Sequence, residues 1–215
     1  MAEERTIAFA DLSGFTALTE AHGDETGAAI ACRFYDMTRS LLRNGATLVK
    51  TIGDAVMIAA PDPDTGAAII LELQTMTDST PNFPRIRAGL HVGPACEVEH
   101  DYFGASVNVA ARVAAYARAG QVLCTAAVAD RIAASSLCKV SRIGPIPLRN
   151  VHDPVVIYEL HNPAVVAAAA HVDPVCRMHV SLDSAVAWVK SGSTEYYFCS
   201  FACLHTFVLE QAASG

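Results

Sequence analysis

Residues 9–20 read FADLSGFTALTE, and this stretch decides how the first part of the chain folds. The apolar run over residues 6–12 is typical of a strand, and Asp11 stands at its end. Ser13, Gly14 and Phe15 are typical of a turn. A carboxylate at such a strand end can hold a divalent cation, while the free N–H groups of the turn and of the following helix face phosphate oxygens.

A second carboxylate stands at the tip of a predicted hairpin. Residues 47–52 and 55–60 form two short strands, with Gly53 and Asp54 between them. If this hairpin lies beside the first strand, Asp11 and Asp54 converge at one end of the sheet, as two metal ions require for an in-line displacement at phosphorus. Each acid alone also fits a structural role, since aspartate is common in turns and at helix caps.

The remaining pattern predicts an α+β protein with a ferredoxin-like core in the order β-α-β-β-α-β, with further elements added. We expect helices over residues 25–43, 64–76 and 106–118 and around Ala129, and strands over residues 86–92, 122–125 and 155–160 and near Val140. Gly93 and Pro94 are expected to end the strand 86–92. Residues 1–162 then form one domain, 163–171 a linker, and 172–215 a Cys-bearing segment that is too short to hold a core unaided.

Composition narrows the class of protein. Hydrophobic residues make up 52% of the 215 residues, so the chain can bury a core, and a net charge of -7 argues against nucleic acid or an anionic membrane as a partner. The first residues are acidic where a signal peptide is basic, and no apolar run approaches the ~20 residues of a membrane helix, so we expect a cytoplasmic protein. Seven cysteines in such a chain favour buried thiols or metal ligands over disulfides.

Asn108 and Arg112 stand four apart in a predicted helix and therefore share one face. Most of that helix is alanine and valine, so the presence of an arginine in it has to be explained. It belongs either to a site or to an exposed face with a surface ion pair, and the pattern alone leaves both interpretations open.

Four separated motifs resemble the class III adenylyl/guanylyl cyclase catalytic domain. They are FADLSGFTALTE, VKTIGDAVMIAA, RAGLHVGP and DYFGASVNVAAR, and the resemblance covers roughly residues 6–160. It implies an adenylate cyclase that converts ATP to 3′,5′-cyclic AMP and pyrophosphate at a homodimer interface, with two Mg²⁺ or Mn²⁺ ions in each active site. A GGDEF-type cyclase shares the core fold, but the hairpin here reads TIGDAV.

The resemblance also implies a role for each matching residue. The metal ligands are Asp11, Asp54 and the backbone carbonyl of Leu12, and the purine is recognised by a lysine and an aspartate, which are Glu and Cys in guanine-specific relatives. Asparagine orients the ribose, and arginine neutralises charge on the α-phosphate and the leaving pyrophosphate. The corresponding residues are Lys50 and Asp101 for adenine, Asn108 and Arg112 for the transition state, and Ser13, Gly14, Phe15 and Arg149 for the phosphates.

One departure from the family concerns the dimer. The stretch GPACEVEHD, residues 93–101, is shorter than in many members of the family, which predicts a dimer that is weaker or relies on another element.

The alternative function is a metal- or redox-responsive module whose cyclase domain is a dimerisation scaffold. An inactive cyclase domain usually lacks at least one of the residues that act on ATP. This chain keeps all six, which are Asp11, Lys50, Asp54, Asp101, Asn108 and Arg112, and this argues against the alternative.

The last forty residues or so carry three clustered cysteines. Cys176 lies in DPVCRMHV, and Cys199 and Cys203 stand four apart in YYFCSFACLHTF. With His179 or His205, three thiolates suit Zn²⁺ or Cu⁺, and the other interpretation is a trio of buried cysteines packed against aromatic residues.

The segment resembles the YHS domain, which is related to TRASH-type metal-binding modules, except that Arg177 replaces a small residue before Met178. We expect metal binding or thiol oxidation in this segment to alter dimerisation and cyclase output.

Overall fold

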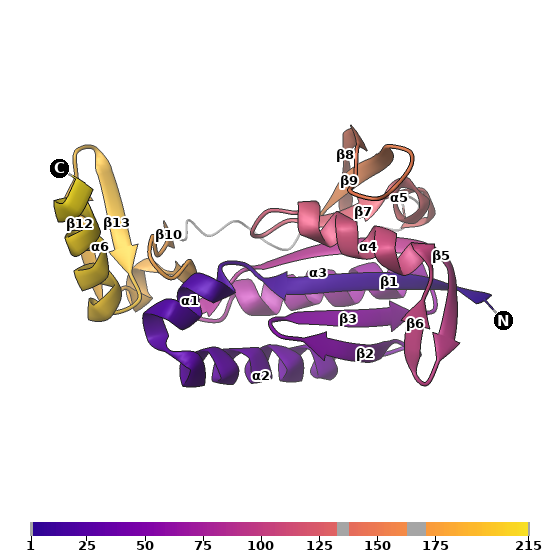
Figure 1. Cartoon of the computed structure of the whole chain (residues 1–215), viewed down its shortest axis with the longest axis horizontal. Coiled ribbons are helices and arrows are strands. Elements are labelled where there is room, and N and C mark those ends of the chain that lie inside the picture. The colour runs from indigo at the N-terminus through magenta and orange to yellow at the C-terminus, as the bar shows by residue number, and fades with distance from the viewer. Residues whose placement is uncertain (1, 133–137, 163–170, 215) are drawn as a thin grey trace.

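The computed structural model describes residues 2–132, 138–162 and 171–214. Its centre is an eight-stranded sheet in the order β2-β3-β1-β5-β7-β9-β8, with β6 paired to β5 (Figure 1). All pairs in it are antiparallel except β5 with β7. The strands are β1 (Ala2–Leu12), β2 (Thr47–Ile52), β3 (Ala55–Ala60), β5 (Ile86–Val98), β6 (Asp101–Phe103), β7 (Val122–Thr125), β8 (Lys139–Ile146) and β9 (Val155–His161).

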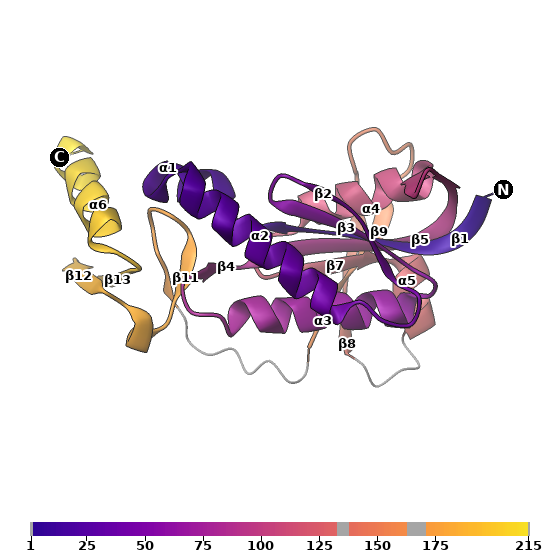
Figure 2. The ribbon, with the colours of Figure 1, turned by 90° about the horizontal axis from the view of Figure 1, so that it is seen from below.

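Helices cover both faces of this sheet, as the turned view shows (Figure 2). One face carries α2, α3 and α5, and the other carries α4. The helices are α1 (Phe15–His22), α2 (Asp24–Leu41), α3 (Pro63–Asp78), α4 (Ala105–Tyr116), α5 (Ala126–Ile132) and α6 (Phe201–Ser214). Among the described residues, no helix combines the length and the apolar character that a membrane span requires.

The alternation of side chains along β1 builds the two cores. Ala8, Ala10 and Leu12 are buried with the α2 and α3 side, whereas Ile7 is buried with the α4 side. Small residues in β1 let the helices approach the sheet closely. Because β1 is covered on both faces and paired on both edges, its last residues are held rigidly, and Asp11 is one of them.

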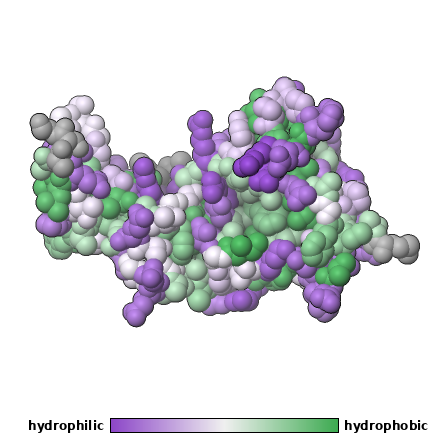
Figure 3. Space-filling model, viewed as in Figure 1, coloured by the Kyte–Doolittle hydropathy of each residue, from purple (hydrophilic) through white to green (hydrophobic). Residues whose placement is uncertain are grey.

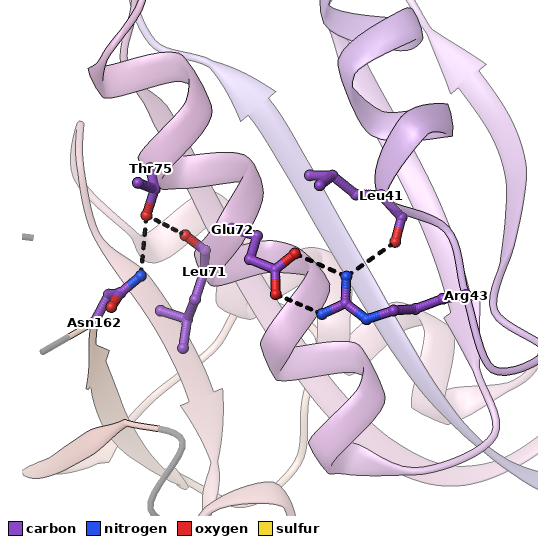
Figure 4. A network of polar contacts seen from close by, with 6 residues as sticks. All are labelled: Leu41, Arg43, Leu71, Glu72, Thr75 and Asn162. Atoms are coloured by element: carbon purple, nitrogen blue, oxygen red, sulfur yellow. Dashed lines mark hydrogen bonds and ion pairs between the residues drawn. The ribbon is translucent and has the colours of Figure 1, made fainter. Parts of the chain in front are cut away.

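Local signals explain where α2 and α3 begin and end. Asp62 caps α3 by accepting a hydrogen bond of 2.8 Å from the Thr65 N–H, and Pro63 occupies the first helical position. Just beyond α2, the Arg43 guanidinium donates to both carboxylate oxygens of Glu72 on α3, at 2.8 and 2.6 Å (Figure 4). This bidentate pair ties the two helices together on the surface.

Most sequence-based predictions for this domain are confirmed, one helix was missed and the end of one strand needs correction. The strands 47–52, 55–60 and 122–125 match β2, β3 and β7. The helix predicted over 25–43 is confirmed as α2, whereas α1, which precedes it and ends at Gly23 with φ 84°, was not predicted. The strand predicted over 86–92 continues through Gly93 and Pro94 to Val98.

The C-terminal segment contains β10 (His171–Val172), β11 (Met178–Val180), a 3₁₀ turn (Leu182–Ser184), β12 (Ala187–Ser191), β13 (Thr194–Phe198) and α6. It is not separate from the first domain, because β11 pairs with β4 (Phe83–Pro84), and Leu18 of α1 enters its hydrophobic cluster. Residues 163–170 of the predicted linker lie outside the described residues, and His171 already belongs to β10. Apolar side chains remain exposed on this segment, among them Trp188, Phe201 and Leu209. Apolar surface can be seen at the left of Figure 3, where this segment lies.

Candidate active site and cysteine cluster

The two predicted carboxylates lie at the same end of neighbouring strands. Asp11 stands opposite Ala55 in the antiparallel pair β1–β3, so Asp54 at the hairpin tip is next to it. The Leu12 N–H donates to the Asp54 carbonyl at 3.2 Å, which fixes the tip against the end of β1. Burial raises the pKa of Asp54, and the nearby charge of Asp11 raises it further. The predicted convergence of Asp11 and Asp54 is therefore confirmed.

Arg87 is a third charged residue at this place, and sequence reasoning missed it. It stands opposite Asp11 in the β1–β5 pair and donates to both carboxylate oxygens, at 2.6 and 2.8 Å. Asp11 in turn raises the pKa of the guanidinium. The sequence did contain a signal for this contact: Arg87 is the first residue of RAGLHVGP, and a charged residue in an otherwise apolar strand needs a partner.

The turn after Asp11 has the predicted position, except that Phe15 already belongs to α1. Gly14 has φ 78°, a conformation that favours glycine, and its carbonyl accepts the Leu18 N–H at 3.0 Å. The Ser13 N–H donates to the Arg85 carbonyl at 2.8 Å. No side chain of the described residues caps α1 at this end, so its first N–H groups stay available to an anion.

Lys50 and Asp101 form an ion pair, although they lie far apart in the sequence. The Lys50 ammonium donates to both carboxylate oxygens of Asp101 at 2.8 and 2.6 Å, and it lies 5.9 Å from the centre of the Phe103 ring. The Tyr102 N–H also donates to Asp101, at 2.8 Å. The bond from Lys50 is the main reason that the pKa of Asp101 is lowered. The structure thus presents a donor and an acceptor side by side.

A tight hairpin positions Asp101. Glu99 and His100 have φ 50° and 66° and connect β5 to β6, so Val98 pairs directly with Asp101. Two consecutive positive φ values are typical of a two-residue turn between antiparallel strands. The shortness noted between residues 93 and 101 therefore has a structural cause, which is that this hairpin has almost no loop.

Asn108 and Arg112 lie one turn apart on α4 and so share a face, as their spacing predicted, and both are exposed. Within the described residues Arg112 has no ion-pair partner, so a structural ion pair does not account for it. A cavity of about 100 Å³ between β1 and α4 is lined by Asp11 and by Ala111, the residue before Arg112. Arg149 is exposed in the turn after β8, and no hydrogen bond among the described residues links it to the carboxylates.

The three C-terminal cysteines come together, but neither predicted histidine joins them. Their Sγ atoms and Nε2 of His22, at the end of α1, form a group within 4.8 Å. His179 alternates with the buried Met178 and Val180 on β11 and so points to the opposite face. His205 is two residues beyond Cys203 on α6 and is exposed on the other side of the helix. His22 was missed because nothing in its local sequence marks it.

A buried carboxylate organises the cysteine turns. Asp173 is 0% exposed and accepts the N–H groups of Val175 at 2.9 Å, Cys176 at 3.3 Å and Cys199 at 2.8 Å. Arg177 has φ 64°, which explains why a small residue is expected there and shows that the turn forms nevertheless.

The pKa values of the three thiols are shifted in different directions. The contact between Cys176 and Cys199 raises the pKa of Cys176 and lowers that of Cys199, while burial raises the pKa of Cys203 to about 12.

Comparison with known families gives a clear match. Residues 1–162 match the model of the adenylate and guanylate cyclase catalytic domain. The pH-sensitive adenylate cyclase MT1302 of Mycobacterium tuberculosis is 37% identical over 166 residues, which are 76% of this chain and 42% of that protein. An adenylate cyclase of Glutamicibacter nicotianae is 34% identical over 129 residues, which are 60% of this chain and 32% of that protein. The chain thus spans less than half the length of these relatives.

Solved structures show the same fold. An adenylate cyclase from Trypanosoma brucei, described in its monomeric state, superposes with a TM-score of 0.68 at 29% identity and covers 75% of this chain and 89% of its own. The adenylyl cyclase CyaB from P. aeruginosa gives a TM-score of 0.66 at 21% identity, with 75% of this chain and 95% of its own covered.

Proposed function

Because the chain belongs to the family of adenylate and guanylate cyclase catalytic domains, we propose that it is an adenylate cyclase. In this proposal two copies convert ATP to cyclic AMP and pyrophosphate, through attack of the ribose 3′-hydroxyl on the α-phosphate. The observation that carries the proposal is the meeting of Asp11 and Asp54 beside an uncapped helix start. Carboxylates and N–H groups side by side are what a metal-bound triphosphate requires.

The carboxylate pair fits Mg²⁺ or Mn²⁺ by its chemistry. Asp11, Asp54 and the Leu12 carbonyl offer only oxygen atoms, which these hard cations prefer. When bound, such ions supply charge stabilisation at phosphorus and ease deprotonation of the 3′-hydroxyl. Arg87 holds Asp11 in position through two hydrogen bonds, and the N–H groups at the start of α1 donate hydrogen bonds to the phosphate oxygens.

Adenine recognition is assigned to Lys50 and Asp101. A lysine donates to a ring nitrogen of adenine, and an aspartate accepts from the exocyclic amine. The two side chains already form a donor and acceptor pair, at 2.6 Å, and guanine presents the opposite groups at the corresponding positions. This pair supports ATP over GTP as the substrate.

Two copies are needed because the residues fall into two groups. Asp11 and Asp54 meet within one chain, whereas Asn108 and Arg112 project from the exposed face of α4. In a symmetric dimer, α4 of one copy supplies its asparagine and arginine to the carboxylates of the other, so two identical sites form. The exposed apolar side chains of Ile52, Val98 and Phe103 offer surface for such a contact, and they are the other element on which the proposed dimer relies.

The test is production of cyclic nucleotide from ATP and from GTP, with Mn²⁺ and with Mg²⁺. We expect cyclic AMP from the wild type and at least about 100-fold less from Asp54→Ala, since a metal ligand is lost. Asp36→Ala, which removes a surface carboxylate paired with Arg39, is the matched control and should retain activity. A folded, dimeric wild type that makes no cyclic AMP would instead favour the metal-responsive scaffold.

A further inference from the structure

We propose that His22 completes a Cys₃His zinc site with Cys176, Cys199 and Cys203, so that the metal fastens the C-terminal segment to the catalytic domain. Three of the ligands lie in the C-terminal segment, and the fourth lies at the end of α1. The proposal does not depend on the cyclase reaction, because it concerns a group of residues away from the carboxylate pair.

Four of the six distances between these atoms are close to those of a tetrahedral zinc site, and all four atoms lie within 4.8 Å of one another. The Sγ atoms of Cys176 and Cys199 are 3.4 Å apart, and those of Cys199 and Cys203 are 3.8 Å apart. Nε2 of His22 lies 3.5 Å from the sulfurs of both Cys199 and Cys203. With zinc bonds of about 2.3 Å to sulfur and 2.0 Å to nitrogen, a tetrahedron has edges of about 3.8 Å between sulfurs and 3.5 Å between sulfur and nitrogen.

The chemistry of the set favours zinc. Three thiolates and one imidazole give a closed set of four ligands, as structural zinc sites have, whereas Cu⁺ prefers fewer ligands dominated by sulfur. The three cysteines are buried, Asp173 fixes the backbone of Cys176 and Cys199, and the Cys203 N–H donates to the Ser200 hydroxyl at 3.2 Å, so little ordering remains to be done when the ion binds.

His22 is held in place by the catalytic domain. Gly23 ends α1 with φ 84°, and its N–H donates to the Thr19 carbonyl at 2.8 Å, so the last turn of the helix is well formed. Leu18, one turn earlier, is buried against the cysteine-bearing cluster. The imidazole therefore faces the thiols because α1 already packs on this segment.

The other end of α1 is in contact with the same segment. A side chain at Gly14 would meet Cβ of Arg177 at 2.5 Å, so Arg177 lies directly on the turn that follows Asp11. Arg177 is next to Cys176, and its N–H donates to the Asp173 carbonyl at 3.0 Å. Zinc bound at His22 thus fixes α1 at its end and holds Arg177 against its beginning, which connects the metal to the turn beside the carboxylates.

The test is zinc affinity, measured by competition with a chromophoric chelator on the full chain stripped of metal under reducing conditions. We expect one Zn²⁺ per chain and an affinity at least about 100-fold lower for His22→Ala. His179→Ala and His205→Ala are matched controls, since each removes a histidine of the segment that does not face the thiols, and both should bind zinc like the wild type. His22→Cys restores a fourth ligand and should recover most of the affinity, which separates ligand loss from misfolding.

Two other readouts examine geometry and coupling. Co²⁺ in the wild type should give the intense visible bands of a tetrahedral thiolate site, and these should change in His22→Ala. Zinc should slow amide exchange in residues 13–22 of the wild type but not of His22→Ala. The proposal is overturned if His22→Ala binds zinc as tightly as the wild type, if a control histidine carries the loss, or if only Cu⁺ binds.

Discussion

Gly89 on β5 offers a sharp test of how α4 is seated. A Cβ atom placed there would lie 2.1 Å from the backbone nitrogen of Ala114 and 2.6 Å from its Cα, both in the last turn of α4. Ordinary contact begins near 3.4 Å, so Gly89→Ala obliges the helix to move away from the sheet by about 1.3 Å. No side chain can rotate to relieve this contact, because the obstacle is the helix backbone.

The expected cost follows from this displacement. Overpacking of a rigid core destabilises by about 1–3 kcal/mol, and we expect Gly89→Ala at or above the upper end of that range in urea denaturation. Asn108 and Arg112 move with the helix, and a misplacement of about 1 Å is enough to lower kcat/KM about 100-fold.

Gly66→Ala is the control for this experiment. The added methyl at Gly66 would meet no backbone atom but only the side chains of Thr6, at 2.8 Å, and of Ala60, at 3.6 Å, and alanine is the better helix former within α3. We expect its stability to stay within about 1 kcal/mol of the wild type. If Gly89→Ala unfolds like the wild type and retains its kcat/KM, α4 is not seated as described, and its role in the site fails with it.

Three further predictions concern other parts of the chain. Lys50→Glu combined with Asp101→Cys should shift the ratio of kcat/KM from ATP toward GTP, and an unchanged ratio would remove this pair from base recognition. Burial raises the pKa of Asp54, and Mn²⁺ binds the ionised carboxylate, so Mn²⁺ affinity should weaken as the pH falls, beginning at a higher pH than for an ordinary aspartate. Titration calorimetry measures this affinity, and Asp54→Asn should bind Mn²⁺ weakly at every pH. Asp173→Ala leaves three N–H groups without their acceptor, at about 1–3 kcal/mol for each one that stays buried, so it should destabilise the C-terminal segment and lower its zinc content, whereas the exposed Asp183→Ala should do neither.

The sequence predicted those features that depend on local pattern. Alternation and turn residues were enough to predict β2, β3 and β7, and the spacing of four placed Asn108 and Arg112 on one face of α4. The convergence of Asp11 and Asp54 could be predicted because strand pairing alone brings them together.

Features that depend on tertiary approach were missed or misread. Gly93 was interpreted as a strand end, but a Cβ there would lie 2.6 Å from the Ser106 hydroxyl, so this glycine serves the close approach of α4. Pro94 is tolerated because β5 has neither β7 nor β6 beside it at that point. His22 lies far from the cysteines in the sequence, and only the packing of α1 against the C-terminal segment brings them together.

The most direct test of the shared active site is mixing two inactive variants, Asp54→Ala and Arg112→Ala, and measuring cyclic AMP production from ATP. Each homodimer should be inactive, because both of its sites lack either a metal ligand or the arginine. In a fully exchanged equal mixture, half of the dimers carry one intact site, so activity should return to about a quarter of the wild-type value. A mixture that exchanges subunits and remains inactive would contradict the proposal that α4 of one copy completes the site of the other.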